Sequence, residues 1–287
     1  MPPLVAIIGT GAMGSAVARR LVEHGCRVIT VLEGRSAASA QRAQAAGMTA
    51  VAARDLATAD FVLSIVPPAA AVGVARHCAP LLAAAATRGA YVDCNAVSPK
   101  TAHEIAAVIE PSGWAFADAG IIGLPPSEPG HTVFYAAGAA AQRFAGLGDY
   151  GLDVRVLDGP VGAASALKMS YAGMTKGVTA ICTAMILAAS RAGAADALRA
   201  ELADSQPELL ARARRQVPGA FTKAYRWVAE MEEIAEFASE DPAAQQIYLG
   251  IARLYARLAA DVAGPNADTR ALQDFLLTAQ SAAHAAH

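Results

Sequence analysis

Residues 4–14 read Leu-Val-Ala-Ile-Ile-Gly-Thr-Gly-Ala-Met-Gly, an apolar run that ends in three spaced glycines. The short, β-rich run predicts a buried strand over residues 4–8. The helical spacing of Val17 and Leu21 predicts a helix over 13–23 directly after it. A G-x-G-x-x-G pattern between a strand and a helix is far more specific than the pattern alone, and it indicates a dinucleotide-binding turn rather than an ordinary glycine-rich one.

The three glycines have different physical roles in such a turn. Gly9 permits the tight turn, Gly11 lets a pyrophosphate approach the backbone, and Gly14 lets the helix pack closely on the strand. The phosphates then lie at the helix N-terminus, where backbone N–H groups are free. We therefore expect cofactor contacts from the whole turn, which comprises Gly9, Thr10, Gly11, Ala12, Met13 and Gly14.

Strands and helices alternate through the first half of the chain. The predicted strands after the first cover residues 27–32, 49–51, 61–66, 90–93 and 114–117, and two more, at 132–136 and 153–157, extend the sheet. Alternation of this kind predicts a parallel sheet with crossover helices. The fold class expected is an α/β Rossmann fold, doubly wound with a mostly parallel sheet, over residues 1–160.

Residues 161–287 show no strand signal and are expected to form an all-helical domain that begins with a long interdomain helix over 163–192. Later helices are expected to be interrupted at Pro218, Pro242 and Pro265. Gly173 and Gly177 form a G-x-x-x-G pattern, which is typical of a face that another helix approaches closely. Because this helix is long for one domain to cover, we expect the helical half to form a homodimer.

Composition excludes several classes of partner. The 287 residues are 55% hydrophobic and carry a net charge of −2, so nothing draws the chain to nucleic acid or to an anionic membrane. The apolar runs are too short or too interrupted by charge for a membrane span, and no signal peptide is evident. The four cysteines fall singly, which predicts neither disulfides nor a metal site. A soluble, cytoplasmic protein with a small-molecule substrate is expected.

The end of the second strand carries signals for both nicotinamide cofactors. An acidic residue there accepts hydrogen bonds from the ribose 2′-OH of NAD, and Glu33 stands at the expected separation. Gly34, Arg35 and Ser36 follow, and Arg and Ser suit the 2′-phosphate of NADP. The alternative for Arg35 is a solvated loop arginine. We expect NADP, with NAD less favoured.

Lysine is rare in this chain, which has 19 Arg and four Lys. Arg cannot lose its proton in a protein, whereas a desolvated Lys can exchange one near neutral pH. Lys168 lies near the start of the long apolar helix, so it is a candidate general acid/base, the alternative being a lysine that reaches solvent from a helix end. Tyr171 is on the same face at i+3 and either orients a substrate oxygen or packs between helices.

Five ordered motifs resemble the β-hydroxyacid dehydrogenase superfamily, which includes 3-hydroxyisobutyrate and 6-phosphogluconate dehydrogenases. The first is the glycine turn, followed by a segment similar to N-R-T/S. That second segment is Gly34–Ser36. The other three are Asp93–Pro99, similar to D-x-S-T-x-x-P, Asp118–Leu124, similar to the substrate-binding D-A-P-V-S-G-G, and Gly162–Lys168, similar to G-x-x-x-x-x-K with the catalytic lysine. The loop after the fourth strand, Ile65–Pro68, also looks like the family's.

The resemblance implies roles for further residues. It places Val66, Pro67 and Asn95 beside the cofactor, and Asn95 with Ile121, Ile122 and Gly123 beside the substrate; for Asn95 the alternative is a turn-forming residue. Lys168 is the implied acid/base of a hydride transfer between NADP(H) and a hydroxy acid or a related alcohol or carbonyl compound.

The chain also departs from the superfamily pattern. The asparagine usual four residues after the lysine is Ala172, and Ile122 replaces a serine that holds the substrate carboxylate. These changes predict a less polar pocket. Two alternatives therefore remain open: an NADPH-dependent enzyme like the imine reductases, which Tyr171 would serve, and a non-catalytic NADP-binding redox sensor.

Overall fold

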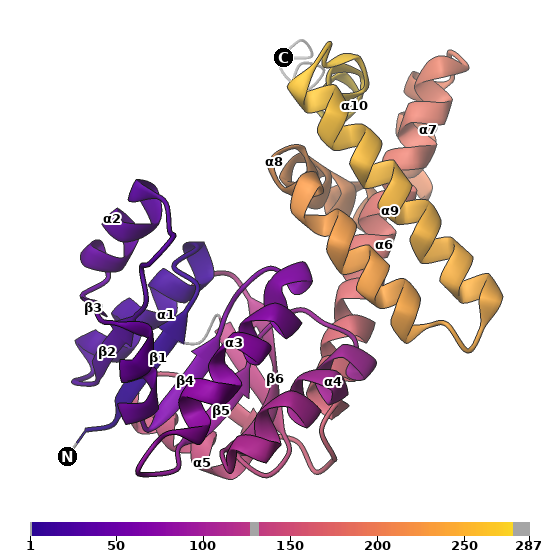
Figure 1. Ribbon diagram of the computed structural model, residues 1–287. Coiled ribbons are helices and arrows are strands. Elements are labelled where there is room, and N and C mark those ends of the chain that lie inside the picture. The colour runs from indigo at the N-terminus through magenta and orange to yellow at the C-terminus, as the bar shows by residue number, and fades with distance from the viewer. Residues whose placement is uncertain (1, 127–131, 278–287) are drawn as a thin grey trace. The chain divides into compact units, whose positions relative to one another are not determined.

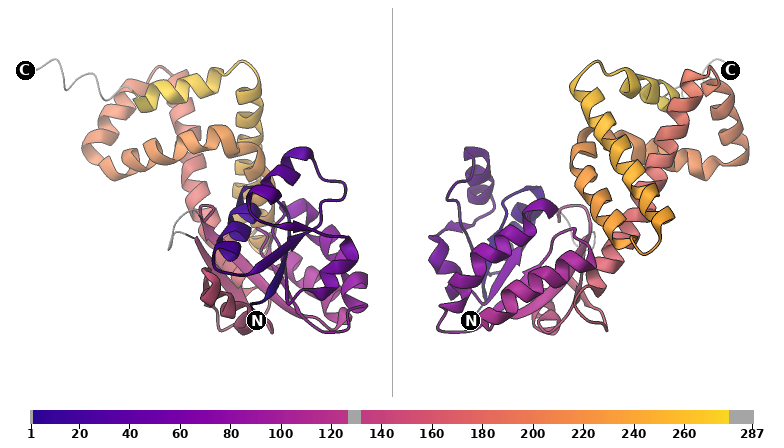
Figure 2. Two further views of the ribbon diagram at one scale, coloured as in Figure 1. Left: turned by 90° about the vertical axis from the view of Figure 1, so that its left-hand side faces the viewer. Right: turned by 45° about the vertical axis from the view of Figure 1, so that its right-hand side comes forward.

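A computed structural model of the chain describes residues 2–126 and 132–277. It divides into two compact units, residues 1–169 and 170–287. Figures 1 and 2 show the first as a sheet with flanking helices and the second as a group of helices. The predicted boundary, between 160 and 161, lies just before the helix α6 (Ala163–Arg191), whereas the first compact unit also includes about two turns of that helix.

The first unit is built on one eight-stranded sheet with the order β3-β2-β1-β4-β5-β6-β7-β8. All neighbouring strands are parallel except β6 and β7. This arrangement confirms the predicted doubly wound, mostly parallel fold. The strands are β1 (Leu4–Ile8), β2 (Arg27–Thr30), β3 (Thr49–Ala50), β4 (Phe61–Ser64), β5 (Ala90–Asp93), β6 (Ala115–Gly123), β7 (Thr132–Ala137) and β8 (Asp153–Val156).

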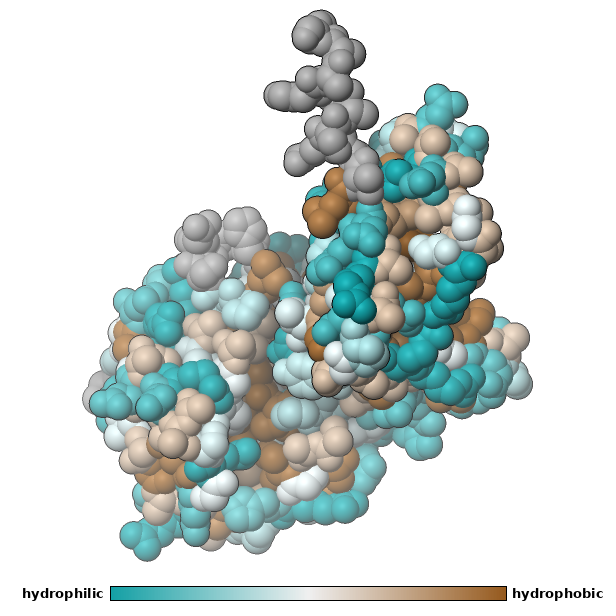
Figure 3. Space-filling model, turned by 90° about the horizontal axis from the view of Figure 1, so that it is seen from above, coloured by the Kyte–Doolittle hydropathy of each residue, from teal (hydrophilic) through white to brown (hydrophobic). Residues whose placement is uncertain are grey.

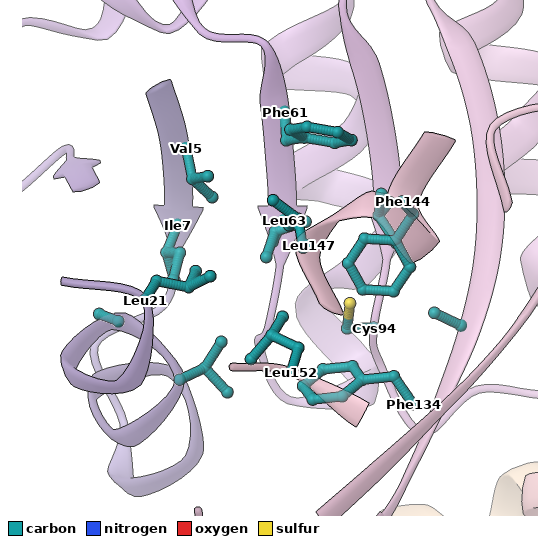
Figure 4. Packing of buried hydrophobic residues seen from close by; sticks show 14 of the residues in the cluster. Val5, Ile7, Leu21, Phe61, Leu63, Cys94, Phe134, Phe144, Leu147 and Leu152 are labelled. Atoms are coloured by element: carbon teal, nitrogen blue, oxygen red, sulfur yellow. The ribbon is translucent and has the colours of Figure 1, made fainter. Parts of the chain in front are cut away.

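Helices cover both faces of this sheet. The α-helices are α1 (Ala12–Glu23), α2 (Ala37–Ala45), α3 (Ala71–Ala83), α4 (Pro99–Ile109) and α5 (Ala141–Ala145); the short 3₁₀ helices are η1 (Ala53–Thr58), η2 (Pro68–Ala70), η3 (Glu110–Ser112) and η4 (Gly146–Tyr150). The α3 and α4 helices pack on one face. The other face carries α1 and α5, and Figure 4 shows the buried cluster there, in which Leu21 lies near Ile7 and Phe144 near Phe134.

One strand is longer than its sequence predicts. The prediction ended it at residue 117, but β6 runs to Gly123. Residues 118–123 pair antiparallel with β7, from Asp118 opposite Ala137 to Gly123 opposite Thr132. Most of the segment that resembles the substrate-binding motif is therefore a strand, because its backbone groups pair with a strand that lies further along the chain.

The described part of the second unit, up to residue 277, is helical without strands, as predicted. It contains most of α6 (Ala163–Arg191), then α7 (Ala195–Ser205), α8 (Pro207–Phe237), α9 (Pro242–Ala263) and α10 (Ala267–Leu277). The expected interruption at Pro218 is wrong, since α8 continues through it. Val217 and Ala220 on either side are fully buried, and tertiary packing of this kind outweighs the loss of one helical hydrogen bond.

The two glycines of the G-x-x-x-G pattern on α6 pack against another helix of this unit. A Cβ on Gly173 would lie 2.8 Å from the Tyr248 hydroxyl of α9, and Gly177 also faces Tyr248 and Ile251. The predicted close approach of another helix is thus confirmed, and the helix is α9 of the same chain. The homodimer prediction must therefore rest on another face.

By length and composition α6 could cross a membrane. Its charge at Lys176 is paired with Glu230 of α8, and Lys176 also lies over the Trp227 ring. The Tyr255 hydroxyl donates to the Lys176 carbonyl, which ties α9 to the same turn. These contacts identify α6 as the central helix of a folded helical unit.

In the face drawn in Figure 3, hydrophobic residues lie in small groups among hydrophilic ones.

Candidate active site and dinucleotide turn

Two of the three glycines in the turn after β1 are required by close contacts, and the third faces open space. Gly9 has φ +106°, and a Cβ there would lie 2.1 Å from the Ile65 carbonyl oxygen. A Cβ on Gly14 would lie 2.0 Å from the Gly9 carbonyl oxygen. A Cβ on Gly11 would meet nothing within 4 Å. Gly9 and Gly14 are therefore required by packing, whereas at Gly11 the backbone faces open space.

The start of α1 offers unpaired backbone donors. Gly11 is the N-cap and supplies no side-chain acceptor, so the first N–H groups of α1 are uncapped. Ala12 is exposed. The carbonyl oxygen of the buried Thr10 accepts a hydrogen bond from the Ser15 hydroxyl (3.2 Å). An open backbone at Gly11 beside uncapped donors fits the pyrophosphate of a dinucleotide. These observations support the cofactor role of the turn.

The segment after β2 is a tight, exposed turn. Arg35 N–H donates to the Leu32 carbonyl (3.0 Å), and Gly34 has φ +69°. Ser36 caps α2 by accepting from the Ser39 N–H (3.3 Å). In the described part of the chain the side chains of Glu33 and Arg35 make no hydrogen bond or ion pair, so both are available to a ligand.

Asn95 joins the ends of β4 and β5. Its amide oxygen accepts from the Val66 N–H (2.7 Å), and its amide nitrogen donates to the Ser64 hydroxyl (3.0 Å) and to the Asp93 carboxylate. The side chain is almost wholly buried. Asn95 therefore holds the loop after β4, in which the Ile65 carbonyl and the Val66 side chain lie against Gly9 of the glycine turn.

Lys168 lies two turns into α6, against strand β6. A Cβ on Gly120 would lie 2.9 Å from both the Lys168 Cβ and the Ala164 carbonyl oxygen, so only glycine permits this approach. The lysine is partly buried, and no hydrogen bond or ion pair of its ammonium occurs among the residues that the structure describes. Burial without a partner lowers the pKa of Lys168 from 10.5 to about 8.

The N-terminus of α6 is held by a carboxylate from the sheet. Asp118 Oδ2 accepts from the Gly162 N–H (3.0 Å) and the Ser165 N–H (2.9 Å), and Oδ1 accepts from the Ser165 hydroxyl (2.6 Å). Burial raises the pKa of Asp118, and these hydrogen bonds oppose the rise. Asp118 thus fixes the register of the helix that carries Lys168.

The remaining predicted residues lie close in sequence to this lysine or its strand. Ile121 is buried on β6, Ile122 is partly buried, and Gly123 is exposed with φ +129°. Tyr171 is one turn beyond Lys168 and about half exposed. Among the residues that were placed, no group of three or more His, Cys, Asp or Glu could hold a metal ion.

Two contacts near the candidate site were not predicted from the sequence. Asp118 was assigned to a substrate segment, but it caps α6 from a distance of more than 40 residues in the chain. Arg42 was not singled out, although its Nε–H donates to the Thr10 carbonyl (2.7 Å) of the glycine turn. No local pattern marks either contact, because each joins elements that are distant in sequence.

Comparison with known proteins agrees with this geometry. Residues 4–147 match the family model described as the NAD binding domain of 6-phosphogluconate dehydrogenase, and residues 189–258 match a domain of unknown function (DUF1932). A curated relative, an uncharacterized 28.5 kDa protein of Methanothermus fervidus, is 28% identical over 81% of this chain and 90% of its own length.

Solved structures show the same fold over nearly the whole chain. The conserved protein MTH1747, described as structurally similar to 3-hydroxyacid dehydrogenases, is 32% identical with a TM-score of 0.69, over 91% of this chain and 98% of its own. The 3-hydroxyisobutyrate dehydrogenase of Mycobacterium tuberculosis is 20% identical with a TM-score of 0.67, over 92% and 96%. The chain therefore belongs to the family defined by the NAD-binding domain of 6-phosphogluconate dehydrogenase, within the β-hydroxyacid dehydrogenase superfamily that its motifs resemble.

Proposed function

We propose that the protein is an NADP(H)-dependent oxidoreductase that moves a hydride between the nicotinamide and a hydroxy acid or a related alcohol or carbonyl compound. The observation that carries this proposal is Lys168, a partly buried lysine without a partner in the described structure and with a pKa of about 8. A group that titrates near the working pH is well suited to general acid/base chemistry. In this proposal the N-terminal domain, which belongs to the NAD-binding family, binds the nicotinamide cofactor, and Lys168 provides the proton.

The proton balance follows from the chemistry of a lysine. In reduction, the Lys168 ammonium gives its proton to the substrate oxygen as the carbonyl carbon gains the hydride that the bound nicotinamide supplies. In oxidation, the neutral amine takes the hydroxyl proton. Asp118 holds the start of α6, and Gly120 lets the Lys168 Cβ approach β6 closely, so the side chain begins from a fixed position.

The proposed substrate-binding surface is less polar than is usual in the superfamily. Ile122 lies two residues after Gly120 on β6, so its side chain is on the face of the strand that contacts Lys168, whereas Ile121 points to the opposite face and packs in the buried cluster there. The Ile122 side chain cannot hydrogen-bond a carboxylate, which favours a substrate with apolar bulk near the reacting carbon. The direct test is a screen of 3-hydroxy acids, aldehydes and cyclic imines with both cofactors, with the Lys168→Ala variant run beside the wild type.

The proposed cofactor is NADP rather than NAD. We expect NADPH to bind about one to two decades more tightly than NADH, because a charge-assisted contact from Arg35 or Ser36 to the 2′-phosphate is worth roughly 1.5 to 3 kcal/mol. Calorimetric titration of both reduced cofactors measures this. Equal or tighter binding of NADH would mean that Glu33 governs the ribose.

We propose that the partner is a second copy of the chain, which binds along one face of α6. Positions 171, 174, 178, 181, 185 and 188 repeat at spacings of three and four, and all six residues are apolar or aromatic. Met174, Ile181 and Met185 are each more than half exposed. An uncharged stripe of this kind is self-complementary about a two-fold axis, which is the usual symmetry of a homodimer.

Substitution in the stripe tests the dimer. We expect the wild type to be a dimer at micromolar concentration and Ile181→Asp to be a monomer, because an unpaired carboxylate in an apolar interface is strongly unfavourable. Light scattering gives the mass. Ile247→Asp on α9, at a similarly exposed isoleucine outside the stripe, is the control and should remain a dimer. A monomeric wild type would refute the proposal.

We also propose that the protein works in the cytoplasm. All four of its cysteines are free thiols. Three are buried, and burial raises the pKa of Cys78 to about 12. Free thiols of this kind are typical of a reducing compartment.

A further inference from the structure

Arg42 links the glycine turn to the segment that follows β2. It lies near the end of α2, and its Nε–H donates to the Thr10 carbonyl (2.7 Å). One Nη2–H donates to the Ser39 hydroxyl (3.1 Å). The Ser39 hydroxyl in turn lies 3.1 Å from the Ser36 hydroxyl. Four side chains and backbone groups thus form one connected chain from Thr10 to Ser36.

The geometry leaves most of the guanidinium free to bind a ligand. Arginine has five N–H donors, and the two hydrogen bonds of Arg42 use two of them. Arg42 is exposed, and within the described residues it forms no ion pair with a carboxylate. The two contacts hold the charge in one place, so little conformational entropy is lost when an anion binds.

The surroundings of Arg42 favour a strongly charged anion. The first turn of α2 contains no acidic residue, and Arg35 lies just before it. Glu33 is the one acidic residue between positions 31 and 46. Ser36 and Ser39 place two hydroxyl groups beside the guanidinium, and hydroxyls with Arg are the usual donors to a phosphate.

The location of Arg42 indicates which phosphate of the cofactor it would contact. The pyrophosphate of a dinucleotide lies on the N-terminus of the first helix, here at Gly11, while the adenosine ribose lies beside the end of the second strand. Arg42 contacts the turn from the side of Ser36 and Ser39, which follow that second strand. A ribose bound beside the end of the second strand would therefore present its 2′ position on the side of Arg42.

We propose that Arg42 binds the 2′-phosphate of the adenosine ribose, together with Ser39, and is a residue that determines specificity for NADP. This inference rests on the proposed NADP preference. It assigns the phosphate to a residue of α2 that is bonded to the glycine turn, in addition to the exposed Arg35 and Ser36.

The test separates the 2′-phosphate from the rest of the cofactor. Full-length protein is titrated calorimetrically with 2′,5′-ADP and with 5′-ADP, which share the adenosine but differ in the 2′ group. We expect Arg42→Gln to lower the affinity for 2′,5′-ADP about 10- to 100-fold and to change that for 5′-ADP less than threefold, as lost charge-assisted contacts imply. Ser39→Ala should give a smaller loss of the same kind, because the arginine keeps its bond to Thr10.

Two further variants exclude trivial explanations. Arg42→Lys keeps the charge but cannot hold the Thr10 and Ser39 contacts together with the phosphate, so it should lose most of the preference. Arg19→Gln replaces an exposed arginine of α1 without a described partner, removes the same charge, and should change neither affinity. Thermal unfolding of each variant shows whether it is folded.

Each other outcome overturns the inference. If Arg42→Gln weakens both ligands equally, Arg42 serves only to hold the Thr10 carbonyl; if it changes neither, Arg42 has no role in binding. If wild type itself does not prefer 2′,5′-ADP, the NADP preference is wrong and this inference fails with it. Hydride transfer would still stand, because it is tested separately through Lys168 with either cofactor.

Discussion

Lys168→Ala is expected to lower turnover by about 10² to 10⁴ while leaving NADPH affinity nearly unchanged. A lost general acid/base costs a factor of this size. The phosphates are expected to lie on the turn at Gly9–Gly14, whereas Lys168 lies on α6 against Gly120 of β6. Steady-state turnover on any accepted substrate and calorimetric titration of NADPH measure the two quantities. Full activity in Lys168→Ala would refute the mechanism.

Lys168→Arg should be almost as damaging as the alanine variant. A guanidinium keeps the positive charge but cannot release a proton near neutral pH. Lys223→Ala, which removes a lysine of α8, is the matched control and should keep wild-type turnover. A nearly active Lys168→Arg would show that charge alone is needed.

The pH profile checks the same group without a substitution. Because burial lowers the pKa of Lys168 to about 8, the ammonium that reduction needs is lost as the pH rises through 8. Reduction should therefore slow above about pH 8, whereas oxidation, which needs the neutral amine, should rise through the same range. Both limbs should disappear in Lys168→Ala.

The alternative functions predict different patterns for these variants. An enzyme like the imine reductases would be damaged more by Tyr171→Phe than by Lys168→Ala, and Tyr171 is about half exposed. A redox sensor would show no turnover in any variant and unchanged cofactor binding. Turnover and affinity for wild type and the three substitutions therefore distinguish the three hypotheses.

Gly14→Ala is expected to lower the melting temperature and abolish detectable NADPH binding. The added Cβ would lie 2.0 Å from the Gly9 carbonyl oxygen, so the backbone of the turn must shift. Overpacking of this kind costs about 1 to 3 kcal/mol, and more where the neighbour is backbone. Thermal unfolding followed by circular dichroism and calorimetric titration measure both effects.

Gly11→Ala should separate binding from stability. Its φ of −73° suits alanine and the new methyl would meet nothing within 4 Å, so the melting temperature should fall only slightly, by the small cost of alanine in place of glycine at the N-cap of α1. The methyl would occupy the space through which the pyrophosphate approaches, so NADPH affinity should fall. Gly73→Ala in α3 also meets nothing within 4 Å and is the control: it should bind NADPH as wild type does and be slightly more stable. Unchanged binding in Gly11→Ala would contradict the assigned role of the turn.

Local sequence determined most of the secondary structure and the fold class. The glycine turn, the parallel strands β1, β4 and β5, and the long helix α6 were predicted within a few residues, because hydrophobic periodicity and glycine spacing are properties of neighbouring residues. The segment with Lys168 was also identified from sequence, through the rarity of lysine and the family motif. These features are encoded within single elements.

Tertiary structure decided what each of those residues contacts. The extension of β6 depends on pairing with β7, and the continuity of α8 through Pro218 depends on the burial of its neighbours. Asp118 caps α6, and α9 covers the small face at Gly173. Each of these depends on residues brought together only by folding.

The chemistry of the candidate site divides in the same way. Sequence alone placed a lysine on an apolar helix, but the lowered pKa of Lys168 results from desolvation, which requires the packed structure around it. The contact of Arg42 with Thr10 spans 32 residues and follows no local pattern. Sequence thus determined which groups are present, and tertiary packing determined their partners and protonation, because hydrogen bonding and desolvation depend on distances in space rather than on order along the chain.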